Sequence, residues 1–552
     1  MRHLAVGLSP LILAVALCTP GSDAQQASST STKPAGSAQA SGNVVSAATV
    51  RAKEPSALDH ARDLYQRGRL DEARAEYEAL SNSGGGDAGG AFAGLARVLL
   101  KQKRVGEADT ASAKALELAP SLLYAHAARG EVFFRQGKLA EAEKEFLTGA
   151  RANPPDARAL LGLTRIYWAT SNYKMAKTRL DQAHRLDPGD PEIRRDWLLT
   201  LKLEDRLKAL KEYLASETND EAEDREDLQH YLVILDDRLG KAKRGCSLVT
   251  KVTSTQTNLV TLREAATSIR GYALNVNING TSSKLLLDTG AGGIVVNSKI
   301  AEKAGLEKVV EQGARGIGDK GSASGYIANA ASIKIGGLEF QGCPIHVIDK
   351  KRALAEDGLI GADVFEDFLV DIDFPNTKFR LSELPPLPDE QVKQAGLAAN
   401  EATAERLHDR YIAPEMKTWE RAFRFGHDLL IWTYANNSAP KLFLLDTGAF
   451  DNMVSEATAR EVSKVHGESD MIVKGISGKV DKIYRTNELT IRFANFQQKR
   501  PDFIAFDLTN ISDHAGTEVG GILGFGMLWM LEIKIDYRDG LVNFIYDENR
   551  FH

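Results

Sequence analysis

The chain is poor in cysteine, with three in 552 residues. That number is too small for a disulfide framework, and no Cys-x-x-Cys pair indicates a structural zinc site. Excess positive charge is also missing. The formal net charge of −6 and the pI near 6.1 give no electrostatic footprint for nucleic acid. Because no Gly-x-Ser-x-Gly or His-Glu-x-x-His segment occurs, serine and zinc-peptidase mechanisms lack a motif, and we expect no metal and no cofactor.

Apolar runs long enough to span a membrane are absent as well. The run from Leu4 to Leu17 is shorter than the ~20 apolar residues that a bilayer span needs. It follows Arg2 and leads to small residues, which is typical of a secretory signal, here residues 1–24. A lipoprotein signal ending at Cys18 and an uncleaved single-pass anchor remain alternatives. We therefore expect an exported protein, periplasmic or secreted, with no membrane span after processing.

What is present is an ordinary globular composition, with 43% hydrophobic and 26% charged residues. The length suggests about three to four domains. Residues 25–54 are rich in Ser, Ala, Gln, Thr and Gly and offer few apolar anchors. Such a segment cannot bury enough surface to offset its conformational entropy, so we predict a disordered spacer.

The first half of the chain carries a repeat with a step of 34 residues. Two series keep this step: Pro120, Pro154, Pro188 and Ala108, Ala142, Ala176. The clearest unit contains Gly130, Phe133, Gly137, Ala142, Phe146 and Pro154. This pattern resembles the tetratricopeptide repeat, in which small residues let paired helices approach and large residues fill the space between them. The resemblance implies an all-α solenoid over residues 55–240, and a groove that could hold a protein partner.

The second half contains a duplicated hexapeptide. Leu286–Ala291 and Leu444–Ala449 have the same sequence, Leu-Leu-Asp-Thr-Gly-Ala, and each ends an apolar run typical of a β-strand. A second pair follows at a similar offset, Gly358–Gly361 and Gly521–Gly524. The repetition of both segments in the same order predicts two related β-rich lobes.

These segments resemble the aspartic peptidases of the pepsin and retropepsin type. In those enzymes each of two lobes supplies one Asp-Thr-Gly loop, the two loops meet, and an apolar-apolar-Gly segment braces each loop. The resemblance implies a two-lobed, mainly-β acid-protease fold with pseudo-twofold duplication, following the helical solenoid. It also implies that Asp288 and Asp446 are the catalytic pair. The residues that it assigns to loop support are Thr289, Gly290, Thr447, Gly448, Gly361 and Gly524.

The chemistry of such a pair follows from electrostatics. Two carboxyl groups within hydrogen-bonding distance do not both ionise easily, so they share one proton. The ionised group can take a proton from water while the protonated group polarises a peptide carbonyl, which needs no metal. Thr289 and Thr447 are suited to tying each loop to its opposite, and glycine permits close approach of the backbone.

A glycine-rich segment follows the first loop and contains Gly316, Gly318 and Gly321. By the same resemblance it is the flap that closes over substrate, with a shorter equivalent at residues 474–479. The three glycines also match a dinucleotide-binding Gly-x-Gly-x-x-Gly. That fingerprint has to open a helix, and the Ser-Ala-Ser-Gly that follows is poor helix material, so we disfavour it.

Cys246 and Cys343 remain after removal of a signal peptide. They could form one disulfide, or Cys343 could be a buried strand residue, and the sequence leaves both open. Asp373 and Asp536 follow the second motif pair at strand ends, and we interpret them as turn residues rather than catalytic groups.

Together these features predict six segments: signal peptide 1–24, disordered spacer 25–54, tetratricopeptide-like repeats 55–240, peptidase lobe 1 at 247–384, interlobe linker 385–420 and peptidase lobe 2 at 421–548. The predicted function is an exported, monomeric aspartic endopeptidase that acts on a peptide or protein substrate, with repeats for protein interaction. One alternative is a catalytically silent peptidase-like scaffold that binds proteins through its repeats. Another is a pair of lobes that each dimerise with a second chain.

Overall fold

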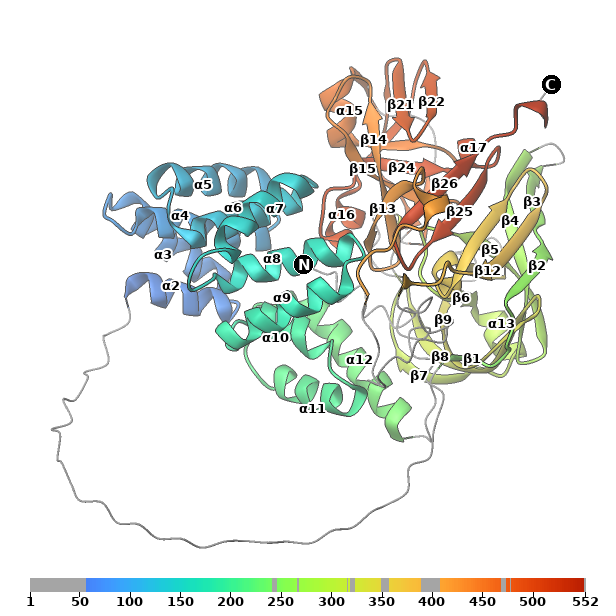
Figure 1. Cartoon of the computed structure of the whole chain (residues 1–552), viewed down its shortest axis with the longest axis horizontal. Helices are drawn as coiled ribbons and strands as arrows, with labels where there is room; N and C mark the ends of the chain where they lie inside the picture. The colour runs from blue at the N-terminus through green and yellow to red at the C-terminus, as the bar shows by residue number, and fades with distance from the viewer. Residues whose placement is uncertain are drawn as a thin grey trace, which may run out of the picture.

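The computed structural model describes residues 56–240, 246–265, 268–314, 316–317, 323–348, 357–388, 408–467, 473–476 and 478–550. The predicted signal peptide, spacer and most of the interlobe linker lie outside these ranges. A helical region and a β-rich region lie side by side (Figure 1), which confirms the predicted fold class. Within the described ranges, no helix is both long and apolar enough to cross a bilayer.

The helical region consists of helix pairs followed by three further helices. In chain order these are α2 (Ala57–Gln66), α3 (Leu70–Asn82), α4 (Ala88–Lys101), α5 (Val105–Leu118), α6 (Leu123–Arg135), α7 (Leu139–Ala150), α8 (Ala157–Ala169), α9 (Tyr173–Leu186), α10 (Pro191–Leu198), α11 (Leu203–Leu214) and α12 (Ala222–Gly240). The repeated glycines allow their close packing. A Cβ atom on Gly130 or Gly162 would lie within 2.5 Å of the Phe146 ring, so a larger residue at either position would push α6 or α8 away from α7.

The first helices of successive pairs bury a ladder of charges. Arg97, Glu131 and Arg165 stand 34 residues apart on α4, α6 and α8, and all three are buried. The Arg97 guanidinium donates to Glu131 over 2.9 Å, and Arg165 donates to the buried Glu192 over 3.1 Å. The Asn219 amide, from the segment before α12, donates to the same Glu192 over 3.3 Å. This face of the repeats is therefore covered in part by the chain itself.

Lobe 1 forms a nine-stranded sheet in the order β1-β9-β6-β10-β5-β4-β8-β7, with β3 paired to β4. Its elements are β1 (Ser247–Leu248), β2 (Ser254–Asn258), β3 (Val260–Ala265), β4 (Ser268–Ile278), β5 (Thr281–Asp288), β6 (Ile294–Asn297), α13 (Ser298–Lys303), β7 (Glu307–Glu311), β8 (Gly325–Ile335), β9 (Leu338–Ile348), β10 (Gly358–Gly361), η2 (Ala362–Phe365), β11 (Phe368–Asp373) and β12 (Lys378–Glu383).

Lobe 2 repeats this plan. Its elements are η3 (Pro414–Met416), β13 (Glu420–Phe425), β14 (Asp428–Ala435), β15 (Lys441–Asp446), β16 (Met453–Ser455), α15 (Glu456–Val462), β17 (Val465–His466), β18 (Lys474–Gly475), β19 (Gly478–Lys479), β20 (Ile483–Thr486), β21 (Leu489–Phe493), β22 (Phe496–Arg500), β23 (Ile504–Phe506), α16 (Thr509–Ala515), β24 (Gly521–Gly524), α17 (Phe525–Leu528), β25 (Glu532–Asp536), β26 (Leu541–Ile545) and η4 (Glu548–Arg550).

A shared sheet joins the two lobes. Strand β11 of lobe 1 pairs antiparallel with β25 of lobe 2, with Ile372 opposite Ile533, so β2, β11 and β12 belong to the sheet of lobe 2. Both isoleucines are fully buried in one core that spans the lobes. The continuous sheet and common core fix the relative position of the two Asp-Thr-Gly loops.

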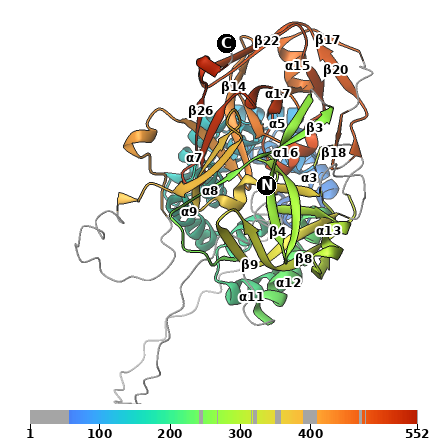
Figure 2. The ribbon, with the colours of Figure 1, turned by 90° about the vertical axis from the view of Figure 1, so that its right-hand side faces the viewer.

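Lobe 1 is also connected to the helices that precede it. A disulfide joins Cys246 to Cys343, which decides between the two alternatives left open by the sequence. The bond ties the segment that follows α12 to strand β9. In addition, α12 packs against β7, and α11 and α12 lie below lobe 1 when the molecule is viewed from the side of the lobes (Figure 2).

The repeats dock directly on lobe 2 through the end of α6. Arg135 forms an ion pair with Asp513 of α16, and Lys103 reaches the same carboxylate over 3.0 Å. The Thr517 hydroxyl donates to the carbonyl of Phe134 over 2.8 Å, and Phe134 shares a hydrophobic cluster with core residues of lobe 2. The helical and β-rich regions thus form a continuous packed interface.

Candidate active site

Each Asp-Thr-Gly loop is placed by a strand and braced by its neighbour. Strand β5 ends at Asp288 and pairs in parallel with β10, which brings Gly361 opposite Asp288. In lobe 2, β15 ends at Asp446 and pairs in parallel with β24, with Gly524 opposite Asp446. The apolar side chains of these strands are mostly buried, so each loop begins at the end of a rigid core strand.

The two threonines connect the loops by reciprocal hydrogen bonds. The Thr289 hydroxyl donates to the carbonyl of Leu445 over 2.8 Å, and the Thr447 hydroxyl donates to the carbonyl of Leu287 over 3.0 Å. Each hydroxyl also accepts from the other threonine's backbone N–H, over 3.0 and 3.1 Å. Four buried hydrogen bonds therefore hold the loops together where the lobes meet.

The carboxyl groups face each other across this contact, and glycine makes the approach possible. A Cβ atom on Gly448 would lie 2.3 Å from Oδ2 of Asp288, and one on Gly290 would lie 2.7 Å from Cγ of Asp446. Either distance is far below van der Waals contact. The structure thus brings together Asp288, Asp446 and the predicted supporting residues, including the bracing glycines Gly361 and Gly524.

Electrostatics distinguish the two aspartates. Burial and the nearby charge of Asp446 raise the pKa of Asp288 well above its ordinary value. Burial also raises the pKa of Asp446, but a hydrogen bond from Asp288 and backbone N–H groups of Gly448 and Ala449, at 2.9 and 2.8 Å, oppose that shift. The pair therefore retains a proton to higher pH than isolated carboxyl groups would, with Asp288 as its preferred holder.

The two flap segments meet. A Cβ atom on Gly316 would lie 3.2 Å from Cβ of Ile476, and one on Gly475 would lie 2.7 Å from Cβ of Ile317. The longer flap of lobe 1 thus contacts the β18–β19 hairpin of lobe 2, which corresponds to the predicted short flap. Gly318 and Gly321 lie outside the described residues.

Asp363 braces the first loop, and the sequence offered no signal for this role. Both of its carboxylate oxygens accept from the N–H of Gly293, at 2.9 and 3.2 Å. Burial raises the pKa of Asp363 to about 6. In lobe 2 glycine (Gly526) takes the position of Asp363, and the loop residue Asn452 instead accepts from the N–H of the bracing Gly524 over 2.7 Å. The bracing residues of the duplicated motif have therefore diverged.

Asp428 is a third carboxyl group beside the pair. Strands β14 and β15 are antiparallel, with Leu430 opposite Leu444. The same register, continued by two residues, places Asp428 opposite Asp446. Burial raises the pKa of Asp428, and the charge of Asp446 acts in the same direction. Only the three-dimensional pairing of the strands reveals this neighbour, because no motif includes it.

Asp373 and Asp536 occupy turns between strands. Asp373 accepts from the N–H of Asn376 over 3.0 Å and pairs with Arg380 over 2.8 Å. Asp536 accepts from the N–H of Asp539 over 2.9 Å. These contacts close the β11–β12 and β25–β26 turns, in keeping with the interpretation of both as turn residues.

Family models match three parts of this chain. One described as "Tetratricopeptide repeat" matches residues 58–122 and 125–191. One described as "gag-polyprotein putative aspartyl protease" matches residues 274–367, and one described as "Aspartyl protease" matches residues 433–526. Each protease match includes one Asp-Thr-Gly loop and its brace. The chain therefore carries N-terminal tetratricopeptide repeats followed by two retropepsin-like aspartyl protease domains.

Curated relatives are similar to this chain over a smaller region. The UBA domain-containing protein Mud1 of Schizosaccharomyces pombe is 30% identical over 149 residues, which are 26% of this chain and 43% of that protein. DNA damage-inducible protein 1 of Kluyveromyces lactis is 28% identical over 141 residues, 25% of this chain and 33% of that protein. The chain thus spans less than half the length of these relatives.

Proposed function

We propose that this chain is an aspartic endopeptidase that hydrolyses peptide bonds with one catalytic pair, Asp288 and Asp446. The observation that carries the proposal is the cross-lobe contact, in which reciprocal threonine hydrogen bonds bring two buried carboxyl groups face to face. Two such groups with raised pKa values are suited to hold one proton between them. Because each lobe supplies one aspartate, a single chain suffices and the active form is a monomer.

The raised pKa values assign a role to each aspartate. Asp446, supported by backbone N–H donors, is the ionised group and accepts a proton from the attacking water. Asp288, whose pKa is raised further by the charge of Asp446, is the protonated group and donates a hydrogen bond to the scissile carbonyl. The negative oxygen that develops on that carbonyl is then stabilised by the Asp288 proton.

This mechanism predicts a bell-shaped pH dependence of kcat/KM. Activity falls at low pH, where both carboxyl groups are protonated and no base remains. It falls again at high pH, where both are ionised and no acid remains. Because the pKa of Asp288 is raised well above its ordinary value, the alkaline limb lies above the usual titration range of a carboxyl group, about pH 4.

We further propose that the enzyme acts outside the cytoplasm, with residues 1–24 removed as a signal peptide. The charged start and short apolar run support export, and the Cys246–Cys343 disulfide suits an oxidising compartment. Mass spectrometry of the N-terminus tests this proposal. A mature chain that begins near residue 25 is expected, and an intact Met1 contradicts it.

The repeats are proposed to hold a protein partner as well as to support lobe 2. The buried charge ladder on α4, α6 and α8 is paired within the chain, so a partner is expected on another exposed part of the repeats. A pull-down with the full chain and with a variant lacking residues 56–240 tests for a partner. Equal recovery of every bound protein by both forms contradicts this role.

A peptide-library digest by the purified mature chain tests the peptidase proposal. We expect cleavage that a pepstatin-type inhibitor blocks and that Asp288→Asn lowers by about 100-fold or more. The inhibitor is also expected to raise the Tm of the wild-type chain by binding. A chain that neither cleaves peptides nor is stabilised by the inhibitor is a silent scaffold, and that result contradicts the proposal.

A further inference from the structure

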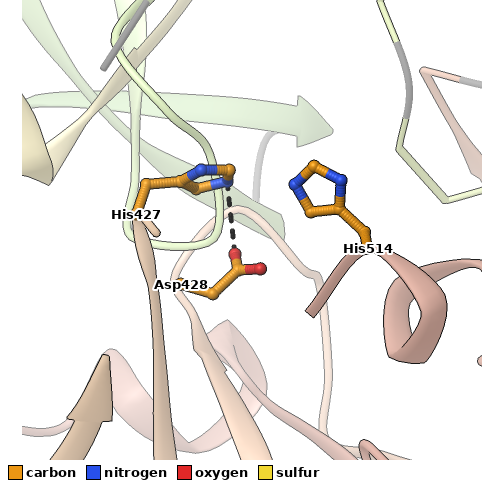
Figure 3. A group of neighbouring side chains, drawn as sticks. All are labelled: His427, Asp428 and His514. Carbon is orange, nitrogen blue, oxygen red and sulfur yellow. Dashed lines mark ion pairs between the residues drawn. The ribbon is translucent and has the colours of Figure 1, made fainter. Parts of the chain in front are cut away.

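Three side chains of lobe 2 converge beside the aspartate pair. His427 and Asp428 stand at the turn that opens β14, and His514 stands in the last turn of α16. His427 Nε2 lies 3.2 Å from Oδ1 of Asp428, and the rings of His427 and His514 have centroids 5.8 Å apart. Figure 3 shows both rings and the carboxyl group directed toward a common point. One ligand atom from each residue lies within 4.8 Å of the other two.

The cluster is largely buried. His427 is 8% exposed and Asp428 is 3% exposed, whereas His514 is half-buried and gives access from solvent. The ring of His427 turns Nε2 toward Asp428 and Nδ1 toward lobe 1 at Gly292, so Nε2 is the atom that this histidine offers to the cluster. Burial of two of the three side chains limits the competition of water for their ligand atoms.

The donor set matches a particular class of metal. Two imidazole nitrogens and one carboxylate oxygen are the ligands of open zinc sites, in which a water or another ligand takes the fourth position. A cation would also stabilise this part of lobe 2, because the strand register places Asp428 opposite Asp446, a second buried carboxyl group. Oxygen-preferring cations such as Mg²⁺ would find too few oxygen ligands here.

We propose that His427, Asp428 and His514 form a binding site for a divalent transition-metal ion of the Zn²⁺ class. Ligand atoms of a tetrahedral zinc site are about 3.4 Å apart, given metal–ligand bonds of about 2.1 Å. All separations are within 4.8 Å, so the ligand atoms have to approach by at most about 1.4 Å. Rotation of the half-buried His514 side chain supplies that movement. The site is distinct from the aspartate pair, because none of its three ligands belongs to an Asp-Thr-Gly loop.

Metal binding itself is measured without using activity. Zn²⁺ is titrated into the mature chain by calorimetry, and Co²⁺ is added separately because its visible absorption reports tetrahedral nitrogen and oxygen ligation. The same titrations on Asp288→Asn separate this proposal from the proposed catalysis. His514→Gln removes one ligand from a half-buried position, and His466→Gln is the matched control, because His466 is exposed on the far strand β17 of lobe 2.

We expect one Zn²⁺ per chain in both the wild-type and the Asp288→Asn proteins. His514→Gln removes a proposed ligand and is expected to weaken binding by about 100-fold or more, since loss of a residue that only hydrogen-bonds to a ligand already costs about 10–100-fold. His466→Gln should bind as the wild type does. Absence of stoichiometric Zn²⁺ binding, or equal affinity in the His514→Gln and His466→Gln variants, overturns the proposed site.

Discussion

Lobe 1 and lobe 2 present the same Asp-Thr-Gly loop on the same pair of parallel strands, but the surroundings of the two loops differ. In lobe 1 the buried carboxyl group of Asp363 accepts from the loop N–H of Gly293, whereas in lobe 2 the loop residue Asn452 accepts from the N–H of the bracing Gly524. Beside Asp446 stands another carboxyl group, Asp428. At the equivalent register position in lobe 1 stands Gly271, which has no side chain to titrate.

The duplicated strands place the two carboxyl groups in the same way, but the two groups do not hold a proton equally. The pKa of Asp288 is raised further, because the charge of Asp446 adds to the effect of burial. At Asp446, a hydrogen bond from Asp288 and the N–H groups of Ala449 and Gly448 oppose the effect of burial. In the proposed mechanism, a proton held preferentially on Asp288 gives each aspartate a defined role.

The lobes also differ in how they are attached to the rest of the chain. Lobe 1 is tied covalently, through Cys246 and Cys343, to the segment that follows α12. Lobe 2 is held by non-covalent contacts with the repeats, in which Arg135 of α6 and Lys103 both form ion pairs with Asp513. Because α16 carries both Asp513 and the adjacent His514, the repeat contact and the proposed metal site share one short helix.

The largest effect is expected when a side chain is added at Gly448 or Gly290, where each loop approaches the aspartate of the other lobe. Gly448→Ala places a methyl group 2.3 Å from Asp288 Oδ2, and Gly290→Ala places one 2.7 Å from Asp446 Cγ. Each change should separate the carboxyl groups and lower kcat/KM by about 100-fold or more. Gly106→Ala is the control, since its Cβ atom would meet nothing within 4 Å. Full activity in either loop variant would show that the carboxyl groups do not need this close contact.

A smaller effect is expected for the threonine hydrogen bonds, which are alike in the two lobes. Thr289→Val and Thr447→Val keep the side-chain shape and remove one hydroxyl each, leaving a buried N–H and a buried carbonyl without a partner. Each should lower the free energy of unfolding by about 2–4 kcal/mol, because an unpaired buried group costs about 1–3 kcal/mol. Denaturant titration measures the loss.

The two threonine variants are expected to agree within about 1 kcal/mol, since their contacts are reciprocal. Thr110→Val, at an exposed helical position, serves as the control and should change the free energy of unfolding by less than about 0.5 kcal/mol. A large loss in one lobe with none in the other would show that the threonine contact is not shared equally.

The smallest effect concerns the attachment of lobe 2 alone. Arg135→Gln removes the ion pair with Asp513 and a hydrogen bond to the carbonyl of Ser512 over 3.2 Å. We expect a loss of about 1–2 kcal/mol in the free energy of unfolding, because the pair is largely shielded from water. Arg104→Gln breaks an exposed pair with Glu107 and is the matched control. Equal losses in both variants would contradict a specific role for the docking contact.

Much of this architecture can be predicted from the sequence because it depends on local and repeated patterns. The 34-residue step predicts the helix pairs, and Gly130 and Phe146 meet as that pattern requires. The duplicated hexapeptide predicts two loops that meet, and the second motif pair predicts the braces that end at Gly361 and Gly524. Both predictions depend on short segments whose spacing is visible along the chain.

The remaining features depend on contacts between distant segments. Nothing near His427 in the sequence points to His514, and Asp428 becomes a neighbour of Asp446 only when β14 pairs with β15. The docking of Arg135 on Asp513 likewise joins residues 378 positions apart. Such pairings arise from the packing of complete lobes, so single-sequence patterns carry no trace of them.

In the proposed mechanism, one aspartate from each lobe of the same chain forms a single catalytic pair. Steady-state peptide cleavage by Asp288→Asn, by Asp446→Asn and by their equimolar mixture tests it most directly. Both variants and the mixture are expected to lose about 100-fold or more in kcat/KM, because no chain then holds a complete pair. Retained activity in either variant would show that one aspartate suffices, and recovery in the mixture would show that lobes pair between chains. Either result would contradict a single pair within one chain.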